Sequence, residues 1–496
     1  MGGHIPFMAP SGPDALGGIG SFTDLPGAPN PFIYTNATEF RKAVTAGYGT
    51  DVAALVGGGA LRLQSLEQTL LRSIQTDLDF KLFNKLAQSS ATATVDEFTV
   101  KESIGGFFGS GFNDELGVIA ETQGTYERRV GLVRFLMTRR QVSVVQESQK
   151  TLVDTIAEEK VDATVELKTT IEWASFYGDS TVMPLEFDGL IKQIGDAGDS
   201  ELILDAAGGG LGTYGEEIIN LAEIVASHGR RGKVTDFFCS PAVQSSELDQ
   251  KLDPAFRVAS TQEGATKIGT PVTAIRTSFG DINSIYDTFI QEGQAPWEGR
   301  GGNFPALVTA AGLTAPVIAS AVAAPNAASK FTAAHAGDYY WGAESVGKAG
   351  RSALALSAQT TVAAGDGVTV TITNPADALV TGFVVHRSRK DGTNAAADLR
   401  DMTRIARAGG ASTVFVDVNE WIPGTSVGFA LSMTPGDNAI NLRRLLPMTM
   451  FPLYPTNTAT RPWAQLFFCY LRLGKRRRHG FIKNILPKRA QWRPFN

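Results

Sequence analysis

The spacing of apolar side chains predicts one long helix over residues 153–177. Apolar residues recur close to the 3.6-residue period of an α-helix, at Val153, Ile156, Val161, Val165, Ile171 and Ala174. The pattern continues through Phe176 and Tyr177 and is predicted to stop at Gly178, because glycine readily adopts the left-handed conformation that often follows a helix. An earlier helical pattern follows a run of three glycines and covers residues 61–78.

Between these helices the pattern changes to that of strands. Residues 94–100 and 130–145 are rich in β-branched and aromatic side chains, which favours two strands. The segment 104–112 between them is too glycine-rich to hold a core of its own. An isolated long hairpin is unstable in water, so we expect the two strands and the segment that joins them to rest on a partner surface.

The rest of the chain divides into regions of different character. Residues 1–50 are rich in Gly, Pro, Asn and Ser and predict an extended arm that becomes ordered on a partner. Residues 185–300 alternate short helices and strands, such as a helix over 216–227 and a strand over 233–239. Residues 305–435 show short alternating runs separated by turns, which predicts an all-β sandwich. No cysteine lies in that stretch, which favours a fibronectin-like over a disulfide-bonded immunoglobulin sandwich.

Composition and charge add two facts. A chain of 496 residues exceeds the usual size of a single core, so two or three domains are expected, and no apolar run is long enough to cross a membrane. The net charge of −5 is unevenly distributed: the last 59 residues carry twelve basic and no acidic side chains, so the first 437 carry −17. This asymmetry suits either a protein whose acidic body meets the basic end of a neighbouring copy or one that presents a basic face to nucleic acid.

Chemistry-bearing motifs are sparse. Residues Gly210, Gly212 and Gly215 make a GxGxxG before a predicted helix, with Asp236 at the distance of a ribose-binding acid. Glu216 and Glu217 would, however, face the pyrophosphate at the helix N-terminus, which disfavours dinucleotide binding. Cys239 and Cys469 are expected to be buried and reduced, the five histidines are too dispersed for a metal site, and we expect neither catalytic residues nor a cofactor.

The end of the predicted long helix, 170–179, and the segment Leu185-Glu186-Phe187-Asp188-Gly189-Leu190 resemble the corresponding part of major capsid proteins from large contractile-tailed phages of the SPO-type and Twort-type group. The segments 58–62, Leu445-Leu446-Pro447-Met448 and Ile482-Lys483-Asn484 are also similar to that family. The resemblance implies an α+β Hong Kong 97-like capsid fold. Its parts are a peripheral domain with a spine helix, an axial domain, an extended loop, an N-terminal arm and an inserted immunoglobulin-like or fibronectin-like all-β sandwich.

The resemblance assigns these parts to residue ranges. The arm would cover 1–55, the peripheral domain 56–190 with the loop at 91–145 and the spine at 153–177, and the axial domain 191–304. The sandwich would cover 305–435, and a closing segment, 436–496, would return to the peripheral domain as a basic strand through 475–485.

The implied function is that of a virion protein that self-assembles into pentamers and hexamers of an icosahedral head around double-stranded DNA. It would assemble in the host cytoplasm, with possible scaffold, portal and decoration proteins and no membrane. The alternatives are an encapsulin-type shell protein and, remotely, a nucleotide-binding oxidoreductase. Candidate inter-subunit contacts lie on the extended loop, the strand after it and the basic closing segment: Lys101, Phe107, Phe108, Phe112, Arg128, Arg129, Arg139, Arg140, Lys475, Arg476, Arg477 and Arg478.

Overall fold

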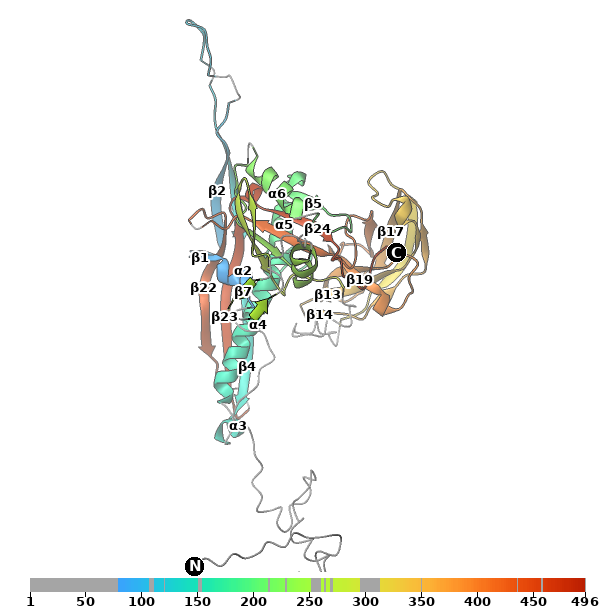
Figure 1. Ribbon diagram of the computed structural model, residues 1–496. Helices are drawn as coiled ribbons and strands as arrows, with labels where there is room; N and C mark the ends of the chain where they lie inside the picture. Colours follow the sequence, from blue (N-terminus) through green and yellow to red (C-terminus); the bar gives the residue numbers. More distant parts are fainter. Residues whose placement is uncertain are drawn as a thin grey trace, which may run out of the picture. The chain divides into compact units, whose positions relative to one another are not determined.

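The computed structural model describes most of the chain from residue 79 onward (Figure 1). The described ranges are 79–106, 111–119, 121–149, 154–212, 215–227, 230–250, 260–262, 265–267, 271–294, 313–348, 350–434, 436–455 and 458–495. All of them belong to one compact unit, Arg72–Asn496. The expected arm at 1–55, the expected first helix at 61–78 and two candidate contact residues, Phe107 and Phe108, lie outside these ranges.

The predicted spine is helix α4, Thr155–Tyr177. It begins where the Asp154 carboxylate accepts the backbone N–H groups of Ile156 and Ala157, as a good N-cap residue does. Its end at Tyr177 is confirmed, but the expected reason is wrong, because Gly178 has a φ of −55° and is not left-handed. A side chain is excluded there by crowding: a Cβ on Gly178 would lie 2.2 Å from the carbonyl oxygen of Phe187.

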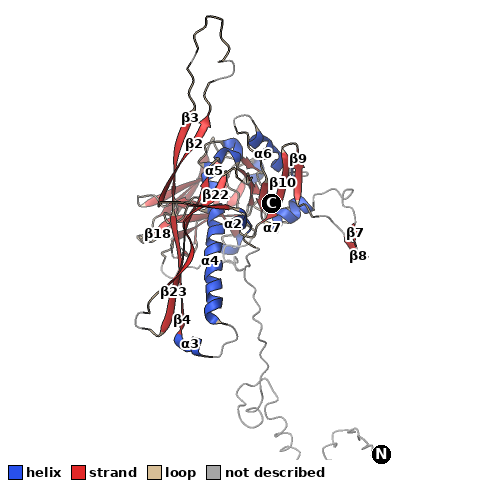
Figure 2. Ribbon diagram, turned by 90° about the vertical axis from the view of Figure 1, so that its left-hand side faces the viewer, coloured by secondary structure: helices blue, strands red, loops and turns tan. Residues whose placement is uncertain are grey.

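The spine lies against a four-stranded sheet (Figure 2). The strand order is β1 (Ala87–Ser90), β22 (Ile440–Pro452), β23 (Thr460–Leu473) and β4 (Arg134–Ser143), with β1 parallel to β22 and the other pairs antiparallel. Short helices α2 (Lys81–Lys85) and α3 (Val144–Ser148) flank it. The buried Glu172 carboxylate of the spine accepts the N–H groups of Leu82 and Phe83, each at 2.7 Å, and so fixes α2 to the helix.

Strands β2 (Val95–Ser103) and β3 (Thr125–Leu132) form a separate two-stranded ribbon that projects from the body (Figures 1 and 2). The expected return strand over 130–145 is therefore wrong, because two strands in different sheets occupy it. The buried Val133 separates them, and its N–H bonds the carbonyl of Thr94 at the base of the ribbon. A continuous run of β-formers does not show where a chain leaves one sheet for another.

A six-stranded mixed sheet lies beyond the end of the spine. Its order is β5 (Ile203–Asp205), β24 (Gly480–Ile485), β21 (Ser426–Leu431), β6 (Asp236–Cys239), β10 (Gly280–Tyr286) and β9 (Ala274–Thr277). Its associated helical elements are α5 (Leu190–Gly195), η3 (Ser200–Leu202), α6 (Glu216–Ala226), α7 (Pro241–Val243) and η5 (Gln244–Asp249). A hairpin of β7 (Ser260–Gln262) and β8 (Ala265–Lys267) pairs separately. Phe176 of the spine packs on Phe238 and Phe429, which joins the helix to this sheet in one core.

The region after residue 313 has its own all-β core. One sheet contains β11 (Val317–Pro325), β17 (Asp366–Thr373) and β20 (Ser412–Asp417). The other contains β14 (Gly350–Arg351), β13 (Trp341–Gly347), β18 (Val380–Ser388) and β19 (Leu399–Ala406), with β15 (Ala355–Leu356) on β13. Strands β12 (Gly337–Tyr339) and β16 (Thr360–Val362) pair nearby, and η8 (Ala333–His335) and η9 (Ala396–Asp398) are single turns. Tyr339, Trp341, Val370 and Phe383 from these strands share one core.

The all-β region returns to the body earlier than expected. Strand β21 falls inside the expected sandwich range of 305–435, yet it pairs with β6 and β24 of the six-stranded sheet. Its sequence is a short, mostly apolar run, which by itself does not show which of two sheets a strand joins.

A buried charge cluster lies within the all-β region. His386 Nδ1 is 3.0 Å from Asp401 Oδ1, and His386 Nε2 is 3.4 Å from Glu344 Oε2. Arg351 Nη1 lies 3.2 Å from both carboxylates, so two cations face two anions when His386 is protonated. Burial opposes protonation of His386, but the nearby carboxylates, above all that of Asp401, raise its pKa above the ordinary value.

This cluster should make the all-β region less stable as the pH rises. A histidine with a raised folded-state pKa contributes fully below its unfolded pKa of about 6.5, and the contribution is lost as the pH rises through the folded pKa. Urea unfolding at increasing pH from 6.5 should therefore show a falling free energy of unfolding, and H386Q should lack that component. Equal pH dependence in the two proteins would contradict this assignment.

Candidate subunit-contact surface

The ribbon carries apolar side chains that nothing in the described part of the chain covers. Phe112, Leu116 and Val118 at its tip are 89%, 96% and 92% exposed. The register runs from Val95 opposite Leu132 to Ser103 opposite Thr125. Exposed apolar groups gathered in this way mark a surface for another macromolecule.

The base of the ribbon is fixed by groups that the sequence analysis did not single out. The Arg443 guanidinium donates to both carboxylate oxygens of Asp96, at 2.8 and 3.0 Å, and the Tyr470 hydroxyl donates to the same carboxylate. Burial alone would raise the pKa of Asp96, but these hydrogen bonds hold it below its ordinary value. The Tyr470 ring fits because position 131 is glycine, where a Cβ would lie 2.2 Å from a ring carbon. The ribbon is thereby anchored to β22 and β23.

The charged candidates on the ribbon have partners in their own chain. Lys101 lies over the Tyr126 ring at 5.5 Å, and Arg128 pairs with Glu97 across the ribbon. Arg129 pairs with Glu102 and Glu127, at 2.7 and 2.6 Å. These contacts stiffen the ribbon and direct its apolar tip away from the body.

The two arginines of β4 have different surroundings. Arg140 bonds Glu159 and Glu166 of the spine, at 3.1 and 2.7 Å, and so joins the four-stranded sheet to the helix. Arg139 is exposed. Both lie in the four-stranded sheet rather than on the return strand of the ribbon.

The basic segment 475–478 was expected to belong to a strand, but it does not. It forms a single turn, η10 (Arg476–Arg478), and the strand that follows, β24, lies between β5 and β21 in the six-stranded sheet. Lys475 and Arg478 pair with Asp437, and Arg477 lies 3.6 Å from Glu102 of the ribbon. Much of the basic charge at the end of the chain therefore meets acidic groups of the same chain.

Between the ribbon and this turn lies a groove of about 1160 Å³. Nine cationic and four acidic side chains line it. We call it the basic groove. It is lined by β2 from Phe98 to Ser103, by residues 104–106, by the start of β3, and by residues 196–197, 230–231, 437–438, 472 and 474–478.

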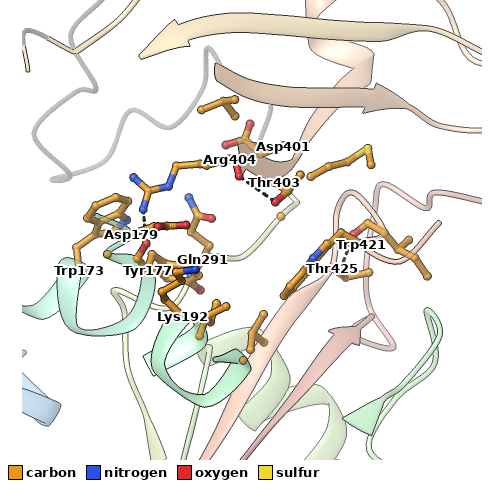
Figure 3. A pocket seen from close by; sticks show the side chains of 18 of the residues that line it. Trp173, Tyr177, Asp179, Lys192, Gln291, Asp401, Thr403, Arg404, Trp421 and Thr425 are labelled. Atoms are coloured by element: carbon orange, nitrogen blue, oxygen red, sulfur yellow. Dashed lines mark hydrogen bonds between the residues drawn. The ribbon is translucent and has the colours of Figure 1, made fainter. Parts of the chain in front are cut away.

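A smaller pocket lies between the end of the spine and strand β19, and Figure 3 shows its lining side chains. The Arg404 guanidinium is 4.8 Å from the centre of the Trp173 ring, donates to the carbonyl of Tyr177 and lies 3.3 Å from Glu186. It thus places a positive charge at the C-terminal end of the helix, where the helix dipole favours one.

We expect R404A to lower the free energy of unfolding of the unassembled chain by about 2 kcal/mol, since hydrogen bonds from a charged donor to a partly buried acceptor are lost. Urea unfolding would measure it. R276A, at a side chain that is 89% exposed, is the control and should change stability by less than about 0.5 kcal/mol. An R404A protein as stable as this control would show that the contact is not structural.

Within the glycine motif, the structure describes residues 210–212 and 215. Gly215 lies at the N-terminus of α6 with a φ of 76°, followed by Glu216 and Glu217. Asp236 is buried in β6 and pairs with Lys85 at 2.6 Å. Cys239 and Cys469 are buried and unbridged. Within the described residues no group of three or more His, Cys, Asp or Glu could hold a metal ion, and no helix is long and apolar enough to span a membrane.

Comparison with known proteins places the chain beside phage coat proteins. It is 25% identical over 464 residues to a protein of Enterococcus phage phiEF24C that is named a major capsid protein, with 90% of this chain and 94% of the relative covered. The major capsid protein of Staphylococcus phage K is 25% identical over 463 residues, with the same coverage of both chains. No protein-family profile matches the chain.

Solved structures with a similar course of the chain include one from Microbacterium phage Oxtober96, at 7% identity and a TM-score of 0.46, covering 88% of this chain and 99% of the other. The SrpI encapsulin of Synechococcus elongatus has 9% identity and a TM-score of 0.39, covering 89% and 97%. The sequence relatives confirm the resemblance inferred from the spine and closing segments, while the SPO-type and Twort-type subgroup stays a prediction. The chain is thus similar in sequence, over nine tenths of its length, to major capsid proteins of Enterococcus and Staphylococcus phages.

Proposed function

We propose that this chain is the major capsid protein of a tailed bacteriophage, a structural subunit of the icosahedral head and not an enzyme. The observation that carries the proposal is similarity to named major capsid proteins over nine tenths of the chain. Those relatives are phage proteins, so they favour a phage head over an encapsulin compartment.

The elements fit the parts of a Hong Kong 97-like subunit. Helix α4 and the four-stranded sheet would be the spine and the peripheral domain, the six-stranded sheet the axial domain and the β2–β3 ribbon the extended loop. The all-β region would be the inserted sandwich, of immunoglobulin or fibronectin type. Its separate core supports a module added to the shell body.

The ribbon supports assembly on physical grounds. A two-stranded ribbon is marginal in water, and its apolar tip gains stability only by burial against another molecule. The free energies of contacts that repeat around each ring and between rings add up. A closed shell is therefore stable even when each single contact is weak.

The structure separates the proposed contact residues that are free to meet a neighbour from those that pair within their own chain. Phe112 at the tip, and Phe107 and Phe108 beside it in sequence, would bury apolar surface on a neighbour. Arg139 and Arg477 are exposed enough to reach another subunit, as is Lys101. Five others would mainly stabilise their own chain through ion pairs: Arg128, Arg129, Arg140, Lys475 and Arg478. Arg476 lies in the basic groove.

The proposed assembly consists of pentamers and hexamers that enclose double-stranded DNA and form in the host cytoplasm. Portal, scaffold and decoration proteins are its possible partners. No membrane is involved in this proposal.

Removal of the ribbon tip tests the proposal. Replacing residues 104–124 with a short Gly-Ser turn should leave the body folded, since its cores lie elsewhere, but should prevent large assemblies. Light scattering would measure particle mass, and circular dichroism would check the fold. Shells of wild-type mass from the shortened chain would contradict a role for the ribbon in assembly.

A further inference from the structure

The basic groove contains more positive charge than its own chain neutralises. Four of its nine cations, Lys101, Arg231, Arg472 and Arg476, make no ion pair with a carboxylate in the described part of the chain. Burial and the neighbouring Arg129 lower the pKa of Arg476 below its ordinary value. Like charges held this close in a groove are costly unless an acidic group enters it.

The ribbon tip has the complementary composition. Residues 102–127 contain five acidic and no basic side chains. Glu102 and Glu127 belong to the groove of their own chain, whereas Asp114, Glu115 and Glu121 are exposed at the tip. Leu116 and Val118 stand beside these acids, so the tip combines negative charge with exposed apolar groups.

We propose that the basic groove of one copy receives the acidic tip of the ribbon of a second copy. This inference rests on the proposed function and names the partner of one of its surfaces. The tip and the groove are different patches, so the contact is heterologous: each copy offers a tip to one neighbour and a groove to the other. Contacts of this kind close into rings when the rotation between copies allows it.

A segment of a second copy fits the groove better than nucleic acid does. Four carboxylates, including Glu102, Glu127 and Asp437, stand among the cations and would repel phosphates brought close to them. A protein segment can place its carboxylates beside Arg231 and Arg476 and its apolar groups beside the ring of Phe98. At about 3.3 Å per residue, the ten residues that follow Gly106, up to Leu116, can reach up to about 33 Å beyond the groove, toward an adjacent copy.

Directed cross-linking tests the contact. L116C and A197C variants, one at the tip and one at the groove wall, would be mixed in equal amounts, assembled and oxidised, and the linked peptides identified by mass spectrometry. The expected product is a dimer joining position 116 of one chain to position 197 of another. The native cysteines are both buried, and L116C mixed with R276C is the control that should give no such product.

Charge reversal gives an independent test. R231E/R476E and D114K/E115K should each lower the yield of rings or shells at least about tenfold, and combining all four changes should restore it to within about threefold, because the charges are exchanged rather than lost. R276E should assemble like the wild type. Unchanged melting temperatures would show that the variants fold.

The outcomes separate this inference from the proposed function. Wild-type chain that never assembles would overturn both. Normal assembly of both reversed pairs, or shells without the 116–197 link, would overturn the groove contact and leave the capsid assignment intact. Loss of double-stranded DNA binding in R231E/R476E with normal assembly would overturn it in favour of a nucleic-acid groove.

Discussion

Replacing Phe176 with alanine is expected to destabilise the unassembled chain by about 3–5 kcal/mol, the usual cost of removing a buried aromatic ring. Phe176 is fully buried at the end of the spine, and its ring centre lies 5.0 Å from that of Phe429 and 6.4 Å from that of Phe238. The variant would leave a cavity between the helix and two central strands of the six-stranded sheet. Few positions join so many parts of the body.

Urea unfolding followed by far-UV circular dichroism would measure this effect, at a protein concentration that keeps the chain unassembled. L185A is a matched control, because Leu185 lies in the turn after the same helix and is 65% exposed. Its expected change is below about 0.5 kcal/mol. Equal stability of F176A and L185A would show that the helix and the sheet do not share a core.

Replacing Arg387 with methionine should destabilise the all-β region by about 3–5 kcal/mol, because it leaves a buried carboxylate without its cation. Arg387 is fully buried, donates to Asp417 at 2.7 Å and to Asn419 at 2.7 Å, and lies over the rings of Phe331 and Tyr339. Asp417 also accepts the indole N–H of Trp341, so the loss would spread through this core.

Hydrogen exchange of amides in β13 and β18 would measure this effect without requiring the whole chain to unfold. R389M is the control, since Arg389 is half-exposed and pairs with Asp398 at 2.9 Å. Such a pair contributes at most about 1 kcal/mol. Loss of protection in both variants to the same extent would mean that the buried pair has no special weight, and loss throughout the chain would mean that the all-β region does not unfold separately.

The spine could be predicted from sequence because its signals are local. Apolar spacing and a glycine at the end both lie within the helix or next to it, whereas the N-cap role of Asp154 was not singled out. The role of Gly178 could not be predicted, because crowding comes from the carbonyl of Phe187, brought close by the turn that follows. The division of 130–145 at Val133 was hidden for a similar reason: only pairing with β23 separates β4 from the ribbon.

The contact surface was predicted less well than the fold. Sequence shows where charge accumulates, but not which groups of the same chain neutralise it. The carboxylate of Asp437, the last acidic residue before the basic end, pairs with Lys475 and Arg478. Asp96 pairs with Arg443, which lies nearly 350 positions later in the sequence. One feature was available in the sequence: all the charged side chains of residues 102–127 are acidic. Its meaning depends on the tertiary structure, which places a basic groove beside this segment.

Electron microscopy of the purified full-length chain under assembly conditions tests the central claim most directly. Closed shells, or rings of five and six subunits, are the predicted result, with the ribbon of each copy lying on its neighbour. A uniform population of one to four chains over a range of salt and protein concentrations would contradict the assignment as a capsid subunit.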